Sequence, residues 1–207
     1  MPPQIGVLAG VNGAGKSSIG GATLRAAGGD YYNPDELARE LMEKGASPDE
    51  ANARAWAAGR DLLQQAIDRG TSFSFETTLG GNTITRLLQE GASRGSEVSI
   101  WFVGLANADL HVARVRARVG RGGHDIPEAL IRQRYEHSRL NLIALLPSLT
   151  ELQLYDNSAE GDLTAGIVPR PRLVLHLKRG RVVGPADLAA TPEWARPIVA
   201  AALRSRG

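Results

Sequence analysis

The chain has 207 residues, 43% of them hydrophobic and 22% charged, the balance of a soluble globular protein long enough to bury one core. A formal net charge of +2 is too small to indicate nucleic-acid binding by itself, and the absence of cysteine excludes disulfides, thiolate nucleophiles and cysteine-ligated zinc. Residues 1–10 show no signal-peptide pattern, and no run reaches the ~18 apolar residues of a membrane helix, so we expect a cytoplasmic protein.

Short apolar segments alternate with amphipathic ones along the chain. We expect strands at 4–10, 30–33, 71–78, 97–105 and 151–157. We expect helices from the glycine-rich loop to about residue 27, from 33, from 47 to about 69, and over 81–92, 107–119 and 127–146. This alternation predicts an α/β fold with a doubly wound, mainly parallel sheet that is covered by helices on both faces.

Two helix starts share one pattern, "NPDE" and "SPDE", in which Asn33 and Ser47 are the expected N-caps and proline occupies the first turn. Within the helix that ends near residue 69, Trp56, Leu63 and Ile67 fall on one face. We therefore expect that face to pack toward the core.

The C-terminal part departs from the alternation. Residues 171–184 are expected to form a β-hairpin, followed by a last helix from Thr191. We expect residues 1–165 to form the core, with a helical lid around 107–146, and residues 166–207 to add a hairpin and a helix to the same domain.

The segment "GVNGAGKSS" after the first strand fits the pattern G-x-x-x-x-G-K-S/T. Glycines let successive backbone N–H groups curl around phosphates, and the following helix presents its positive N-terminal end to them. In such a loop Lys16 reaches the β and γ phosphates, and the Ser17 hydroxyl can ligate magnesium. The expected nucleotide-binding residues of the loop are Gly10, Asn12, Gly13, Ala14, Gly15, Lys16, Ser17 and Ser18.

Carboxylates follow two other strands of the expected sheet. The strand "EVSIWFVGL" ends without one, which argues against the arrangement of a hydrolysing motor. Asp35 follows the second strand, and Glu76 ends the third, next to Thr78. Ligands bind at these strand ends in a doubly wound sheet, where a carboxylate can accept a proton from a hydroxyl. Alternatively, Asp35 only favours the helix dipole, and Thr78 is only a β-former.

An arginine-rich segment with a glycine turn in its middle follows. Its arginines are Arg114, Arg116, Arg118, Arg121, Arg132, Arg134 and Arg139. We favour Arg118, Arg121 and Arg134, with His124, as groups that close over a triphosphate, because they lie near the turn. The others are expected to pair with acidic neighbours on a solvated face. Only Tyr135 interleaves the segment, so base stacking on a nucleic acid has little support.

The motifs "VLAGVNGAGKSS", "NPDELA", "FETTL", "GRGGHDIP" and "LYDNS", in this order over residues 4–158, resemble those of zeta-toxin-like P-loop kinases. The best-understood members of that family phosphorylate a sugar hydroxyl of UDP-N-acetylglucosamine with ATP and Mg²⁺. The resemblance implies that Asp35 is the base toward the hydroxyl and that Glu76 and Thr78 bind the acceptor. It also implies that Lys16 and lid arginines hold the phosphates, with Asn157 near the nucleotide.

One position departs from the family pattern. Family toxins place a lid arginine just before the proline segment, where this chain has His124, with Arg121 three residues earlier. The resemblance thus leaves the phosphate-clamping residue open between lid positions. It implies an antitoxin-like protein partner in the toxins, but no antitoxin-binding segment is recognisable in this sequence.

We therefore expect a kinase that transfers the γ-phosphate of ATP to a small-molecule hydroxyl, with a nucleotide sugar as the favoured acceptor. Catalysis is expected from Lys16, Asp35, Arg121 and Arg134, with magnesium on Ser17. Two alternatives stay open: a nucleotide-binding switch with weak hydrolysis, and, less favoured, a kinase that acts on nucleic-acid ends.

Overall fold

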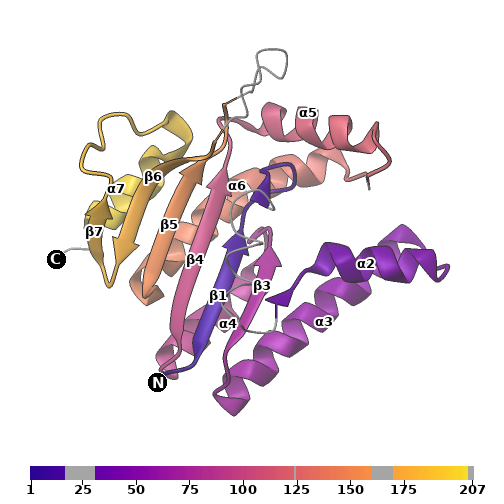
Figure 1. The fold of residues 1–207 in the computed structure, drawn as a ribbon, viewed down its shortest axis with the longest axis horizontal. Coiled ribbons are helices and arrows are strands. Elements are labelled where there is room, and N and C mark those ends of the chain that lie inside the picture. Colours follow the sequence, from indigo (N-terminus) through magenta and orange to yellow (C-terminus); the bar gives the residue numbers. More distant parts are fainter. Residues whose placement is uncertain (17–30, 124, 160–169, 205–207) are drawn as a thin grey trace.

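A computed structural model describes residues 1–16, 31–123, 125–159 and 170–204 (Figure 1). Its strands form one seven-stranded sheet in the order β2-β3-β1-β4-β5-β6-β7. The first five strands in the chain run parallel, and β6 and β7 add an antiparallel edge beside β5. Their bounds are β1 Gln4–Ala9, β2 Tyr31–Tyr32, β3 Phe73–Thr77, β4 Glu97–Gly104, β5 Glu151–Asp156, β6 Arg172–Lys178 and β7 Arg181–Gly184. The predicted α/β class and mainly parallel sheet are confirmed.

The described helices begin and end within two residues of the predicted bounds up to residue 146. They are α2 Pro34–Glu43, α3 Pro48–Arg69, α4 Asn82–Ser93, α5 Ala108–Val119, α6 Glu128–Leu145 and α7 Arg196–Arg204, with 3₁₀ turns η2 Leu146–Ser148 and η3 Glu193–Ala195. The last helix starts later than predicted, because Thr191 lies in a turn and helical structure begins only at η3. The helix expected from the glycine loop to residue 27 lies outside the described residues. None of the described helices combines the length and apolar character that crossing a bilayer requires.

Both predicted caps form. The Asn33 side-chain oxygen accepts a hydrogen bond from the Asp35 backbone N–H at 3.0 Å, and the Ser47 hydroxyl accepts one from the Glu50 N–H at 3.3 Å. Each cap satisfies an N–H group that has no partner inside its own helix. The chain direction at the start of α2 and α3 is therefore set locally by the sequence.

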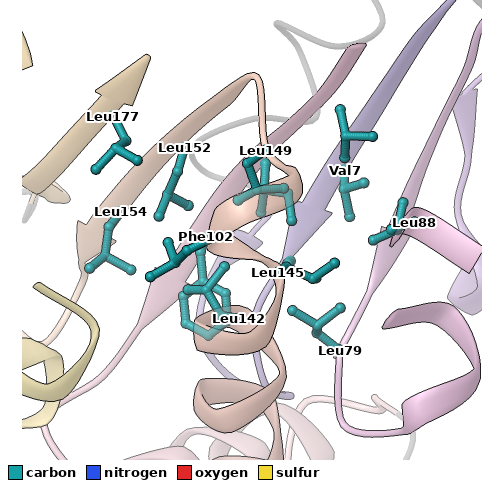
Figure 2. Close-up of a cluster of buried hydrophobic side chains, with 14 of the residues drawn as sticks. Val7, Leu79, Leu88, Phe102, Leu142, Leu145, Leu149, Leu152, Leu154 and Leu177 are labelled. Atoms are coloured by element: carbon teal, nitrogen blue, oxygen red, sulfur yellow. The ribbon is translucent and has the colours of Figure 1, made fainter. Parts of the chain in front are cut away.

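The main core lies between one face of the sheet and helices α3, α4, α6 and α7. Strand alternation sends every second side chain to this face, so Val7, Phe102 and Leu152 meet Leu142 and Leu145 of α6 (Figure 2). All five are at most 1% exposed. This packing fixes α6, which carries part of the arginine-rich segment, against the centre of the sheet.

The C-terminal segment is packed into the same core. The Trp194 indole lies directly over Gly104, where a Cβ atom would come within 2.2 Å of the ring. Its ring centroid is 6.4 Å from that of Phe102, and its Nε1 donates a hydrogen bond to Asp156 Oδ1 at 3.2 Å. Trp194 is only 4% exposed, so the segment after β5 closes the sheet edge and covers the ends of β4 and β5.

We expect Trp194→Ala to lower the free energy of unfolding by about 3–5 kcal/mol, because it removes a buried aromatic ring and leaves a cavity. Chemical denaturation followed by circular dichroism measures this change. Val183→Ala on β7 is the control, since Val183 is 55% exposed and its loss should change stability by less than about 0.5 kcal/mol. If Trp194→Ala behaves like the control, the C-terminal segment does not belong to the cooperative core.

Candidate active site

The carboxyl ends of the parallel strands form the edge at which the candidate site lies. The chain leaves β1 toward β2 on one side of the sheet and leaves β4 toward β5 on the other. Such a divergence opens a crevice in doubly wound sheets. In Figure 1, α5 lies beyond these strand ends, and α2 and α3 lie beside the β2–β3 edge. The loop after β1 therefore faces a space bounded by helices on two sides.

The glycine loop is shaped by three residues with positive φ, Gly10 (148°), Gly13 (80°) and Gly15 (82°). A Cβ atom at Gly10 would come within 2.4 Å of the Val103 carbonyl oxygen, so β4 presses directly on the loop. The Lys16 Nζ atom donates back to the Gly10 carbonyl at 3.0 Å. Only glycine combines this backbone conformation with such close approaches, which explains why the loop needs its glycines.

His111 of α5 supports the loop from behind. Its Nδ1 lies 2.9 Å from the Asn12 carbonyl oxygen, and a Cβ atom at Gly13 would come within 2.8 Å of the His111 carbonyl. Burial lowers the pKa of His111 from 6.5 to about 4. The ring is therefore neutral at pH 7, with Nδ1–H donating to the carbonyl.

Asn157 supports the loop from the other side. Its side-chain Nδ2 donates to the Ala14 carbonyl at 2.8 Å, and its backbone N–H donates to Gly104 at 3.0 Å. A Cβ atom at Gly15 would come within 2.5 Å of that Nδ2. The structure thus places Asn157 under the loop backbone, where it holds the loop against the ends of β4 and β5.

Four charged groups surround the Lys16 amine. Burial lowers the pKa of Lys16, the carboxylates of Glu76 and Asp35 oppose this, and the guanidinium groups of Arg118 and Arg134 reinforce it. The structure therefore brings together five of the residues that the sequence singled out, from β3, α2, α5, α6 and the loop. Of the other predicted residues, Ser17, Ser18 and His124 lie outside the described residues.

Glu76 is held by β-strand alternation on the sheet face opposite Phe73 and Phe75, whose rings stack 5.5 Å apart. Glu76 is only 8% exposed, and the Tyr31 hydroxyl donates to its Oε1. A buried carboxylate needs such a donor. Tyr31 is a site residue that the sequence reasoning missed, although it lies in the short strand that directly precedes Asp35.

Asp35 lies exposed in the first turn of α2, and Arg134 reaches toward it from α6. The Arg134 Nη1 donates to the Asn12 side-chain oxygen at 2.7 Å, and burial lowers the pKa of Arg134 while Asp35 raises it. Gly80 allows this approach, since a Cβ atom there would come within 2.7 Å of the Arg134 Cγ. Arg134 therefore joins the loop to the acidic side of the site.

The loop between β3 and α4 is fastened by side chains. Thr77 and Thr78 hydroxyls accept from the backbone N–H groups of Leu79 and Gly80, at 3.0 and 3.4 Å. The buried Asn141 of α6 donates to the Leu79 carbonyl at 2.8 Å. Asn141 was not predicted, because a single Asn in a helix pattern carries no signal of which loop it will meet.

A cleft of about 1010 Å³ opens in front of these groups, between α2 and α3 on one side and the α5–α6 turn on the other. Predicted residues lining it are Asn12, Asp35, Glu76, Thr78, Arg118 and Arg134. Arg121, Lys16 and Asn157 are not among the described residues that line it. Arg121 instead lines an adjoining pocket of about 470 Å³ with Arg114 and with Arg118, which also lines the cleft.

The remaining arginines of the segment are bound in surface ion pairs. Arg116 and Arg132 both pair with Glu128 at 2.7 Å, and Arg139 pairs with Glu136 while its guanidinium stacks 4.2 Å from the Tyr135 ring centroid. These ion pairs agree with the expectation that the arginines in question lie on a solvated face and pair with acidic neighbours. The structure thus separates arginines that reach the loop from arginines that brace the helical hairpin.

One core prediction is wrong. Leu63 and Ile67 of α3 are buried at 0% and 3%, but Trp56, expected on the same face, is 48% exposed and lines the cleft. Near Trp56, helix α3 packs through the small residues Ala55 and Gly59, and both contact the Tyr32 side chain. These small residues bring α3 too close to the sheet edge for an indole to fit between them.

We expect the stability of the protein to fall below pH 6.5 in part through His111. Between pH 6.5 and about 4 the unfolded state binds a proton on this ring that the folded state does not. The free energy of unfolding should therefore lose roughly 3 kcal/mol over that window from His111 alone. Denaturation of wild type and His111→Gln at several pH values measures this, and equal pH slopes for the two proteins would show that His111 is not buried and neutral.

We expect Asn157→Ala to weaken binding of an ATP analogue about fivefold to tenfold, because the loop loses a hydrogen bond to its backbone. Isothermal titration calorimetry measures the dissociation constant. Gln153→Ala on β5, the strand that precedes Asn157, is the matched control, since the Gln153 amide bonds to Glu151 and Tyr155 and not to the loop. Equal effects from both variants would contradict the role of Asn157.

Comparison with known proteins agrees with this geometry. The family model of the zeta toxin matches residues 1–159. An uncharacterised protein of Haemophilus influenzae is 31% identical over 130 residues, which cover 61% of this chain and 88% of that protein.

Solved structures with the same fold include the AvrRxo1-ORF1:AvrRxo1-ORF2 complex and a toxin–antitoxin system. The AvrRxo1-ORF1:AvrRxo1-ORF2 complex matches with TM-scores of 0.64 with sulphate ions and 0.62 with ATP, at 18% and 17% identity, over 91% and 97% of this chain. This chain spans 62% and 64% of the matched chains. The PezAT toxin–antitoxin system of Streptococcus pneumoniae matches with a TM-score of 0.53 at 18% identity, over 75% of this chain and 68% of that one. At these identities the structures establish the fold, and the family model establishes the relationship: the chain belongs to the zeta toxin family of P-loop phosphotransferases.

Proposed function

We propose that this protein transfers the γ-phosphate of ATP to a hydroxyl group of a small molecule, with a nucleotide sugar such as UDP-N-acetylglucosamine as the favoured acceptor. The observation that carries the proposal is the convergence of Lys16, Asp35, Glu76 and Arg134 between the glycine loop and a large cleft. A switch or a simple hydrolase needs the loop but has no use for a chamber of this size beside it.

In this mechanism Asp35 accepts the proton of the acceptor hydroxyl. The hydroxyl oxygen forms a bond to the γ-phosphorus while the bond from that phosphorus to the β–γ bridging oxygen breaks, which releases ADP. Lys16 and Arg134 stabilise the negative charge that spreads over the transferring oxygens. Asp35 suits the proton transfer because it is exposed to the cleft, whereas Glu76 is buried under the Tyr31 hydroxyl.

Glu76 and Thr78 are proposed to orient the acceptor. Glu76 has one oxygen engaged by Tyr31, and its position lining the cleft lets the carboxylate accept from a second hydroxyl of the acceptor. Holding the hydroxyl against Asp35 supplies the proximity on which phosphoryl transfer depends. Arg118 at the end of α5 and Gly123 of the following turn are proposed to close over the cleft and exclude water.

Magnesium fits this donor set as a partner of the phosphates. Among the described residues, no group of three or more histidine or acidic side chains could hold a metal ion by itself. Mg²⁺ instead prefers phosphate oxygens, waters and one or two protein oxygens, for which we propose the Ser17 hydroxyl. When bound, it neutralises charge on the β and γ phosphates.

A cytoplasmic location and a protein partner are further parts of the proposal. Among the similar structures, AvrRxo1-ORF1:AvrRxo1-ORF2 is a complex of two proteins and PezAT is a toxin–antitoxin system, and this likeness supports a protein partner for this chain. Its charge and aromatic content give no support to nucleic acid as the acceptor. That alternative and the switch are outcomes of the experiment that follows.

We expect Asp35→Asn to lower phosphate transfer at least 100-fold while ATP still binds, because it removes the proton acceptor and leaves the loop intact. The assay incubates the full chain with ATP, Mg²⁺ and a panel of metabolites, nucleotide sugars first, and detects phosphorylated products by mass spectrometry. Calorimetry with a non-hydrolysable ATP analogue measures binding.

Two controls frame this result. Glu36 is the next acid in the same helical turn and does not line the cleft, so Glu36→Gln should keep full transfer. Lys16→Ala should abolish transfer. Steady ADP release without any phosphorylated compound would favour the switch, and labelled oligonucleotides would favour the nucleic-acid alternative. Full transfer by Asp35→Asn would show that Asp35 is not the base.

A further inference from the structure

The cleft continues well past the charged centre. Its distant wall is built by α2 and α3 and carries Arg39, Met42, Asn52, Trp56 and Arg60. Of the glycine loop, only Asn12 lines the cleft among the described residues. A volume of about 1010 Å³ lies at the upper end of the range for whole small-molecule sites. The acceptor therefore has room for a second part beyond the reacting hydroxyl.

Trp56 is the dominant apolar group of that wall. Its side chain is 48% exposed, whereas Ala51, Ala55 and Gly59 of the same helix are buried. The backbone beneath it is fixed, because the Tyr32 hydroxyl donates to the Ala55 carbonyl and the Tyr32 ring packs on Gly59. A rigidly mounted, exposed indole in a cleft is a surface on which a planar ring can stack at low entropic cost.

Arg60 stands one helical turn from Trp56 and adds a cation to the surface. Its guanidinium carbon is 5.3 Å from the Trp56 ring centroid, and its Nε donates a hydrogen bond to Asp61 Oδ1 at 2.8 Å. Arg39 of α2 lines the same wall. The wall thus combines an aromatic face with positive charge, which suits a flat ring linked to an anionic group such as phosphate.

We propose that Trp56 and Arg60 bind the base and the adjoining phosphate of a nucleotide-type acceptor, so that Trp56 determines specificity for base-bearing acceptors. The ring stacks on Trp56, Arg60 contacts the phosphate, and the remaining part of the acceptor extends toward Asp35 and Glu76. The inference rests on the proposed function, because that function gives the direction in which the acceptor extends from the wall toward Asp35 and Glu76. Binding of the acceptor at this wall requires no phosphate transfer.

The test measures equilibrium binding to the full chain with its glycine loop saturated by a non-hydrolysable ATP analogue. The base-bearing probe is UDP-N-acetylglucosamine, and the probe without a base is N-acetylglucosamine 1-phosphate. We expect Trp56→Ala to weaken binding of the first about tenfold and of the second less than twofold. Trp56→Phe should recover most of the loss, and Arg60→Gln should weaken the base-bearing probe more than the other, because only that probe carries the phosphate that adjoins the base.

Leu62→Ala is the matched control, since Leu62 is a 40% exposed apolar residue of the same helix that does not line the cleft. It should leave both dissociation constants unchanged. Equal weakening of both probes by Trp56→Ala would indicate stacking against the sugar, and would overturn the proposal. No effect on either probe, or no measurable binding of the base-bearing probe to wild type, would also overturn it.

Failure of this inference differs from failure of the proposed function. Trp56-dependent binding of the base-bearing probe without phosphate transfer would refute the reaction and keep the binding surface. Phosphate transfer to a base-bearing acceptor with kcat and KM unchanged in Trp56→Ala would refute the binding surface and keep the kinase.

Discussion

The rest of the site depends on how the backbone of the glycine loop is held. Two of its carbonyl groups, those of Asn12 and Ala14, are bound from opposite sides by the buried side chains of His111 and Asn157. Because these two carbonyl groups point into the protein, the opposite side of the loop faces the carboxyl ends of the strands. Because one anchor is on α5 and the other follows β5, the loop is shaped only when both elements are packed on the sheet.

The charges of the site depend on this frame. Lys16 is partly buried, so its amine is costly to keep charged and responds to every carboxylate and guanidinium nearby. Glu76 is set by strand alternation, Asp35 by a helix cap and Arg134 by the packing of α6 through the gap at Gly80. Four elements that are distant in sequence thus deliver charges of both signs to one crevice, an arrangement suited to moving a phosphoryl group.

The C-terminal segment and the cleft wall show how much of the molecule serves that crevice. The family match ends at residue 159, yet Trp194 covers Gly104 and bonds to Asp156, next to the Asn157 anchor. At the opposite edge of the sheet, the small residues Ala55 and Gly59 let α3 pack closely against Tyr32, and Trp56 lies in the cleft. Packing at each end of the sheet therefore shapes the space beside the loop.

The sequence by itself determined the fold class, most of the strand and helix bounds, the capped starts of α2 and α3, and the glycine loop, because periodicity, caps and positive-φ glycines are local properties of the chain. It also singled out Asp35, Glu76 and Arg134. Only the tertiary structure decided that Tyr31 and Asn141 support the site, that Arg121 lines a different pocket, and that Trp56 is exposed. These depend on which residues distant in sequence become neighbours, and on how closely two elements can approach, which no local pattern encodes.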